Sequence, residues 1–214
     1  MRNQSKPFDP QAPAASMLVR LSAALLLVAL SAASALAQQP AAATTASATV
    51  SVASAAPKVG EAAPDFKLPY ATAEKIFFRP DDHMALSSLR GKNVILAFYP
   101  ADWSGGCTSE VCTFRDSFAD LGKLNAVVLG ISGDYVFSHH EWAKHHKLQF
   151  PLLSDHDHAV AKRYDSYMEQ YGLNKRTIFV IDKAGVVRYS NLDFKAGDKA
   201  HYDALRAELE KLNK

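Results

Sequence analysis

Residues 100–116 read PADWSGGCTSEVCTFRD and directly follow an apolar, strand-like run at 94–99. They contain the only two cysteines of the 214-residue chain, Cys107 and Cys112. The pattern predicts a buried strand, a glycine-containing turn and a helix that begins at or near Cys107. A thiol at a helix N-terminus meets unsatisfied N–H groups and the positive end of the helix dipole, which favour the thiolate. Because the thiolate is the nucleophile, this placement indicates redox chemistry rather than packing.

The two cysteines lie on different sides of the predicted helix at 107–123. At about 100° per residue, Cys107 shares a face with apolar side chains, whereas Cys112 lies about 140° away from it. The apolar face carries Val111, Phe114, Phe118 and Leu121. Cα atoms five residues apart on a helix are separated by about 8–9 Å, beyond the ~7 Å limit for a disulfide. A Cys107–Cys112 bond would therefore require the first turns to unwind, which Gly105 and Gly106 make easier.

The rest of the chain alternates strand-like and helix-like segments. Further strands are predicted at 126–131, 177–182 and 186–190. Lys183-Ala-Gly185 is a hairpin signal between the last two of them. Further helices are predicted at about 137–147, 157–168 and 199–212. The order βαβα…ββα, with a parallel start and a hairpin end, predicts an α/β, thioredoxin-like fold with a central mixed sheet flanked by helices.

The stretch from Pro100 resembles the peroxiredoxins of the AhpC/TSA superfamily. Their signature Pro-x-x-x-Thr/Ser-x-x-Cys stands here as Pro100, Ser104 and Cys107. A second cysteine five residues on is similar to the bacterioferritin-comigratory (peroxiredoxin Q) branch. Similar blocks follow in order over about residues 58–190, namely at 59–69, 137–142, 150–155 and 176–182. Trp103 and Gly105 depart from the branch pattern, which usually has Phe and Pro there.

The resemblance implies a thiol-dependent peroxidase without a cofactor, acting on hydrogen peroxide and organic hydroperoxides. Cys107 would attack the peroxide and become a sulfenic acid, and Cys112 would then close an intramolecular disulfide. Thioredoxin, or an exported relative of it, would reduce that disulfide by exchange. The protein is expected to be a monomer or a weak dimer.

Four further residues receive roles from the same resemblance. Ser104 and Arg176 would stabilise the thiolate and the departing oxygen, Pro100 would shield the sulfur, and Glu110 would hold the arginine. Each of them also has an ordinary structural explanation. These explanations are an N-cap for Ser104, a strand end for Pro100, a surface charge for Arg176 and a helix-dipole partner for Glu110.

Three other classes of function stay open. A thiol–disulfide oxidoreductase of the same fold uses Cys-x-x-Cys, whereas the spacing here is Cys-x₄-Cys. A copper-binding thioredoxin-like protein uses a closer thiol pair, and a non-catalytic binding domain would not need the full set of site residues. The chain has eight histidines, four of them at 139, 140, 145 and 146, but none has the i, i+4 partner of a helical metal pair. We therefore expect no metal site.

The N-terminal region is typical of a targeting segment. Arg20 precedes the apolar run 21–30, and small residues end at Ala35-Leu-Ala37, which is the plan of a secretory signal peptide. We therefore expect a signal peptide at 1–37, with Met17 as an alternative start, and export to a bacterial periplasm. A run of ten residues is short for a span, which needs about 20 predominantly apolar residues, so no stable membrane insertion is expected after cleavage. A retained anchor is the alternative.

A linker and one domain follow this segment. Residues 38–57 are nearly all Ala, Ser, Thr, Val, Gln and Pro, without charge, which predicts a disordered linker before a domain at 58–214. The formal net charge is +2, and residues 1–37 hold three basic residues and one acidic residue. The remainder has 21 of each sign, so nothing indicates nucleic acid as a partner.

Overall fold

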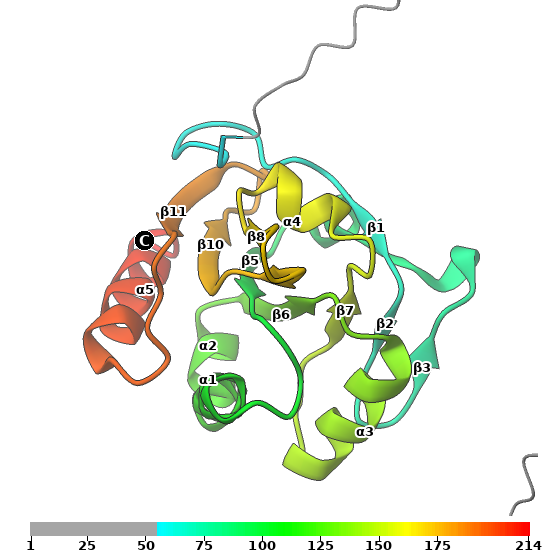
Figure 1. Cartoon of the computed structure of the whole chain (residues 1–214). Helices are drawn as coiled ribbons and strands as arrows, with labels where there is room; N and C mark the ends of the chain where they lie inside the picture. The colour runs from blue at the N-terminus through cyan, green and yellow to red at the C-terminus, as the bar shows by residue number, and fades with distance from the viewer. Residues whose placement is uncertain (1–54) are drawn as a thin grey trace, which may run out of the picture. The chain divides into compact units, whose positions relative to one another are not determined.

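The computed structural model describes residues 55–214 (Figure 1). The predicted signal peptide at 1–37 and all but the last three residues of the predicted linker at 38–57 lie outside the described residues. Among residues 55–214, no helix combines the length and the apolar character that a membrane span requires.

A mixed sheet of seven strands forms the centre of the domain, in the order β11-β10-β5-β6-β7-β2-β3. The three inner strands that run parallel are β5 (Asn93–Phe98), β6 (Ala126–Ser132) and β7 (Leu152–Ser154). The strands added antiparallel at the two sides are β10 (Thr177–Ile181), β11 (Val187–Asn191), β2 (Tyr70–Ala71) and β3 (Ile76–Phe77). The predicted α/β fold, its parallel start and its terminal hairpin are confirmed.

Short elements connect these strands. One small pair consists of β1 (Lys67–Leu68) and β4 (Met84–Ala85), and another of β8 (Tyr167–Met168) and β9 (Leu173–Asn174). Two 3₁₀ turns, η1 (Pro80–Asp82) and η2 (Leu86–Leu89), precede β5. None of these elements was predicted, because strands of two residues leave no periodicity to detect.

Two of the predicted helices are confirmed and two are corrected. The helices α3 (Val136–His146) and α5 (Lys199–Lys211) match their predictions closely. The single helix expected at 107–123 is wrong, because α1 (Gly105–Asp116) begins two residues earlier and Ser117 separates it from α2 (Phe118–Lys123). A serine competes for helix hydrogen bonds and favours such breaks.

The helix expected at 157–168 is also wrong, since α4 spans only Ala159–Arg163. The buried carboxylate of Asp155 accepts the N–H groups of Val160 and Ala161 at 3.0 and 2.7 Å and thereby supports the start of α4. Asp165 adopts a left-handed conformation with φ of 49° and stops the helix.

Side chains that alternate along the strands form two apolar layers. Ile95, Ala97 and Tyr99 face the layer that also contains buried residues of α1, α2, α3 and α5. Their neighbours Val94, Leu96 and Phe98 face the other layer, with α4 and the segment before β5. Figure 1 shows α4 on the opposite side of the sheet from α1, α2 and α3. A strand buried on both faces reads as a continuous apolar run, as 94–99 does.

The sheet topology brings two distant segments together. Because β10 runs antiparallel to β5, Thr177 at the start of β10 pairs with Phe98 at the end of β5. Arg176 therefore lies beside the chain as it leaves β5 for Pro100 and α1. The N–H of Phe194, from the loop between β11 and α5, donates to the Arg176 carbonyl at 3.2 Å.

Candidate active site

The Cys107 thiol lies at the start of α1, in contact with the side chain of Arg176. Gly105, Gly106 and Cys107 are the first three residues of the helix, whose N–H groups have no carbonyl partner within it. The Cys107 side chain is fully buried, and Nη2 of Arg176 donates to its sulfur at 3.2 Å. The helix N-terminus and the guanidinium thus present positive charge to one sulfur, which favours the thiolate.

Glu110 holds the other side of the same guanidinium. Nη1 of Arg176 donates to Oε2 of Glu110, while Oε1 has no partner among residues 55–214. Burial raises the pKa of Glu110 to about 7, and Arg176 opposes that rise. Burial lowers the pKa of Arg176, but Glu110 and Cys107 more than compensate, so its pKa is raised and it stays charged. The structure thus brings Cys107, Glu110 and Arg176 together.

An open pocket of about 590 Å³ reaches this group. Gly106 and Arg176 line it together with the apolar side chains of Met168 and Leu192. A Cβ at Gly106 would lie 3.3 Å from Nη2 of Arg176, so the absence of a side chain there lets the guanidinium approach the helix. Gly105 and Gly106 were expected upstream of the helix, but both lie in its first turn.

Ser104 and Pro100 lie on the loop that precedes α1. Ser104 has the extended conformation of an N-cap, but its hydroxyl donates to the carbonyl of Ala101 at 3.1 Å instead of capping the helix. The expected hydrogen bond from Ser104 to the thiolate is therefore not made in this structure. Pro100 is half-buried and directly follows Tyr99, at the end of β5.

The second thiol points away from the first. Cys112 is half-buried on the flank of α1, and its sulfur lies 3.7 Å from Nδ1 of His146 on α3. Both thiols are free. Val111 and Phe114 are buried on the face of Cys107, so the predicted division between the apolar face and the flank is confirmed.

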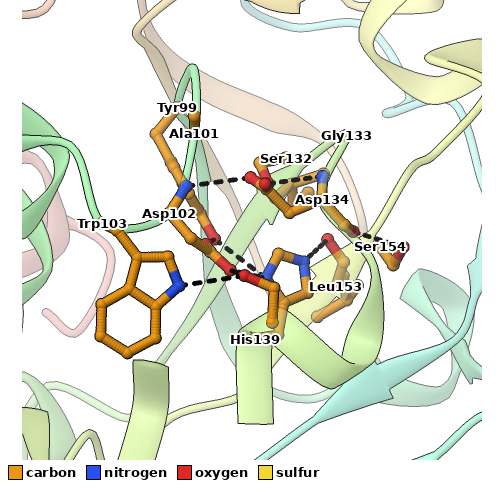
Figure 2. A network of polar contacts seen from close by, with 12 residues as sticks. Tyr99, Ala101, Asp102, Trp103, Ser132, Gly133, Asp134, His139, Leu153 and Ser154 are labelled. Carbon is orange, nitrogen blue, oxygen red and sulfur yellow. Dashed lines mark hydrogen bonds and ion pairs between the residues drawn. The ribbon is translucent and has the colours of Figure 1, made fainter. Parts of the chain in front are cut away.

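A buried polar network holds the loop that leads to the first thiol (Figure 2). Asp102 accepts the hydroxyl of Tyr99 at 2.8 Å and the Nδ1 of His139 at 2.9 Å. The Nε2 of His139 faces the carbonyl of Leu153 at 3.2 Å. Both ring nitrogens of His139 thus face oxygen atoms, and its contact with Asp102 is fully buried. Burial and Asp102 raise the pKa of Tyr99, so its hydroxyl remains a donor.

The same network fixes an unusual backbone conformation. Trp103 has φ of 63°, which is uncommon for a bulky residue, and its indole N–H donates to Ser138 at 3.2 Å. Ser138 in turn donates to Asp102 at 2.7 Å, and the Asp102 N–H donates to Asp134 at 2.9 Å. Figure 2 shows these groups converging from the loop, α3 and the ends of β6 and β7. The loop before Cys107 is therefore anchored on three sides.

Sequence reasoning missed this network. The sequence pattern indicated His139 only as a candidate metal ligand, and it gave no role to Asp102 within the 100–116 window. The sequence feature that could have predicted the network is the position of Asp102, a carboxylate between the buried strand β5 and the helix that carries Cys107. Among residues 55–214, no three His, Cys, Asp or Glu side chains converge as metal ligands would.

Comparison with known proteins decides the family. The sequence profile described as "AhpC/TSA family" matches residues 59–190, more than half of the chain. The chain belongs to the AhpC/TSA family. A protein of Coxiella burnetii whose name places it with the bcp peroxiredoxins is a 40% identical member, over 61% of this chain and 85% of its own length. The predicted resemblance to peroxiredoxins of this branch is confirmed.

Other members of the AhpC/TSA family extend the comparison. Peroxiredoxin Q of Oryza sativa subsp. japonica is 43% identical over 61% of this chain, but the match spans only 57% of the rice protein. The crystal structure of peroxidoxin BcpB from Mycobacterium tuberculosis has a TM-score of 0.63 at 33% identity, covering 73% of this chain and 98% of its own. AhpC of Enterococcus faecalis has a TM-score of 0.64 over 72% of this chain and 92% of its own, and at 23% identity it supports the fold alone.

Proposed function

We propose that the protein is a thiol-dependent peroxidase that reduces hydrogen peroxide and organic hydroperoxides through Cys107. The observation that carries this proposal is the 3.2 Å contact between Nη2 of Arg176 and the Cys107 sulfur at the start of α1. A thiol whose sulfur faces a fixed cation and free N–H groups is poised as a nucleophile. Membership of the AhpC/TSA family supports the same chemistry, and the spacing of the two cysteines favours neither a Cys-x-x-Cys oxidoreductase nor a copper site.

The reaction proceeds in two steps. The Cys107 thiolate attacks one peroxide oxygen, the O–O bond breaks, and the departing oxygen takes up a proton and leaves as water or an alcohol. Arg176 and the N–H groups of the first helical turn stabilise charge on that oxygen. The thiol of Cys112 then attacks the sulfenic acid of Cys107, which releases water and forms a disulfide.

A dithiol protein returns the enzyme to its reduced form. We propose thioredoxin or an exported relative as this partner, because thiol–disulfide exchange needs an attacking thiolate and no further cofactor. We propose that the enzyme works as a monomer or a weak dimer.

The peroxidase activity is tested by mixing the reduced protein with hydrogen peroxide or with an organic hydroperoxide in a stopped-flow instrument. Tryptophan fluorescence should change, since Trp103 and Trp142 both lie against His146, which contacts Cys112. Both thiols should be lost for each peroxide consumed. If peroxide is not consumed, and Cu(II) instead produces visible absorbance in the same sample, the protein belongs to the copper-binding class.

Formation of the disulfide should unwind the first turns of α1, because an intact helix holds its two thiols too far apart. We expect amides of residues 105–114 to exchange faster in the oxidised protein, while those of β5 keep their protection. Gly105 and Gly106 favour this opening, since each glycine weakens a helix by about 0.5–1 kcal/mol relative to alanine. Hydrogen exchange on both redox forms measures it. Equal protection in a protein with a verified Cys107–Cys112 bond, or a dimer linked through either cysteine, would contradict the mechanism.

We further propose that the protein is exported and that residues 1–37 are removed. Arg20, the apolar run 21–30 and the small residues at 35–37 support this proposal. N-terminal sequencing of the protein from a cell-envelope fraction should give a chain that starts near Gln38. An uncleaved chain in the cytosol would refute export.

A further inference from the structure

The C-terminal end of α3 lies beside the second thiol. Nδ1 of His146 lies 3.7 Å from the sulfur of Cys112, within the range of a hydrogen bond that involves sulfur. The ring of Trp142 lies perpendicular to the His146 ring at 5.8 Å, and that of Trp103 lies 6.5 Å away. The imidazole therefore contacts two indoles and has one nitrogen directed at the thiol.

Burial and the charged groups around His146 disfavour its protonated form. Arg115, on α1, donates from Nη1 to the His146 carbonyl at 3.0 Å, and its Nε pairs with Asp116. On α3 itself, the ring of His145 lies 4.7 Å away. Burial, His145 and Arg115 all lower the pKa of His146 below its usual value of 6.5. A neutral imidazole has a free nitrogen that can accept a proton, and Nδ1 is the nitrogen that faces Cys112.

We propose that His146 accepts the proton of Cys112 while α1 is still intact, so that Cys112 then attacks the sulfenic acid of Cys107 as a thiolate. This proposal rests on the proposed peroxidase function and adds a catalytic residue to its second step. The Cys112 thiol gives its proton to Nδ1, and its sulfur forms a bond to the sulfur of Cys107. The S–O bond of the sulfenic acid breaks, and the departing hydroxide takes up a proton and leaves as water. The proton that His146 received passes to solvent, so the imidazole is neutral again.

The order of events follows from the geometry. His146 contacts Cys112 only while α1 is intact, because unwinding carries Cys112 away from α3. The proton must therefore leave before the helix opens. Arg115 lies three residues beyond Cys112 on the same helix, so its positive charge accompanies the thiolate.

The test uses the Cys107→Ser protein, in which Cys112 is the only thiol and peroxidase activity plays no part. The rate at which iodoacetamide alkylates Cys112 is measured from pH 6 to 10 with His146 and with His146→Asn. An asparagine amide keeps a hydrogen-bond acceptor near the Nδ1 position but cannot take up a proton. At pH 7 an unassisted thiol is only a few per cent thiolate, so we expect His146→Asn to slow alkylation about tenfold. Above about pH 9 the difference should vanish, because the thiol then ionises without a base.

His140→Asn is the matched control, since it removes another histidine of α3 whose ring faces the Thr72 carbonyl rather than the thiol. It should change alkylation at pH 7 by less than about twofold. Equal rates for His146 and His146→Asn at pH 7, or an equal loss in His140→Asn, would overturn the proposal. Because this assay needs no peroxide, its result is independent of whether the peroxidase function holds.

A second measurement covers the case in which His146→Asn does not fold. The NMR titration of the His146 ring is compared between the Cys107→Ser protein and the Cys107→Ser/Cys112→Ser protein. Two groups that exchange a proton titrate as a coupled pair. Loss of the Cys112 thiol should therefore shift the apparent pKa of the His146 ring. An unchanged titration would overturn the proposal. In the chain with both cysteines, His146→Asn should slow only the second, disulfide-forming phase.

Discussion

Replacement of Cys107 by serine should abolish reaction with peroxide, whereas Cys112→Ser should still consume one equivalent. A serine hydroxyl remains protonated at neutral pH and cannot replace the thiolate that Arg176 and the start of α1 stabilise. Cys112 acts only after the sulfenic acid has formed, so its loss stops turnover but not the first attack. The measurement is the loss of hydrogen peroxide at one equivalent per protein, without a reductant.

The two variants control each other, since each keeps one thiol in an otherwise identical chain. In Cys112→Ser the sulfenic acid should persist and be trapped by dimedone at Cys107. A single turnover that survives in Cys107→Ser and disappears in Cys112→Ser would reverse the two roles.

Arg176→Ala should slow peroxide attack about 10²–10³-fold, because the guanidinium contacts the sulfur at which charge is redistributed. Loss of one such electrostatic interaction corresponds to about 2–4 kcal/mol at the transition state. Arg176→Lys should recover only part of the rate. The planar guanidinium of Arg176 contacts Glu110 and Cys107 with two different nitrogens, whereas a lysine ammonium has only one. The second-order rate constant from stopped-flow fluorescence is the measurement. A rate near that of the parent in Arg176→Ala would exclude the role.

The stability of Arg176→Ala should depend on pH through Glu110. The pKa of Glu110 is raised from 4.5 to about 7, so the folded state holds this proton more tightly than the unfolded state does. Stability therefore falls as pH rises from about 4.5 to 7. Without Arg176 the pKa of Glu110 rises further, so the stability of the folded state continues to fall above pH 7. Urea denaturation should show that Arg176→Ala has a slightly lower free energy of unfolding than the parent at pH 6 and a much lower one at pH 8. In the control variant Glu110→Gln/Arg176→Ala, the loss should be the same at both pH values.

Much of the active site could be predicted because its key residues are close in sequence. Pro100, Ser104, Cys107, Glu110 and Cys112 lie within 13 positions, and a helix of known geometry relates the last three. The apolar face of Cys107 and the flank position of Cys112 followed from the helical period alone. Arg176 is different, since it lies 69 residues from Cys107 and was assigned through the resemblance to peroxiredoxins. The pairing of β10 with β5 explains why the two meet.

The helix boundaries were predicted less well, for local reasons. Ser117 interrupts an apolar pattern that continues through α2, and periodicity alone cannot detect such a break. Asp165 stops α4 with a left-handed backbone conformation that asparagine and aspartate tolerate in turns as well as at helix ends. The hydroxyl of Ser104 had two expected partners and takes neither, since it donates to the carbonyl of Ala101 within its own loop.

The sequence by itself determined the fold class and the family and indicated Cys107 as the proposed reacting thiol, because buried strands, helix periods and a compact motif are all local properties. Only the tertiary structure decided which distant polar groups share a buried space. The Asp102–His139 contact joins residues 37 apart, and the Cys112–His146 contact joins residues 34 apart. Each of these pairs depends on how α3 packs against the loop and against α1. A side chain can be assigned to a helix face from its spacing, but its partner across an interface depends on the packing of both elements.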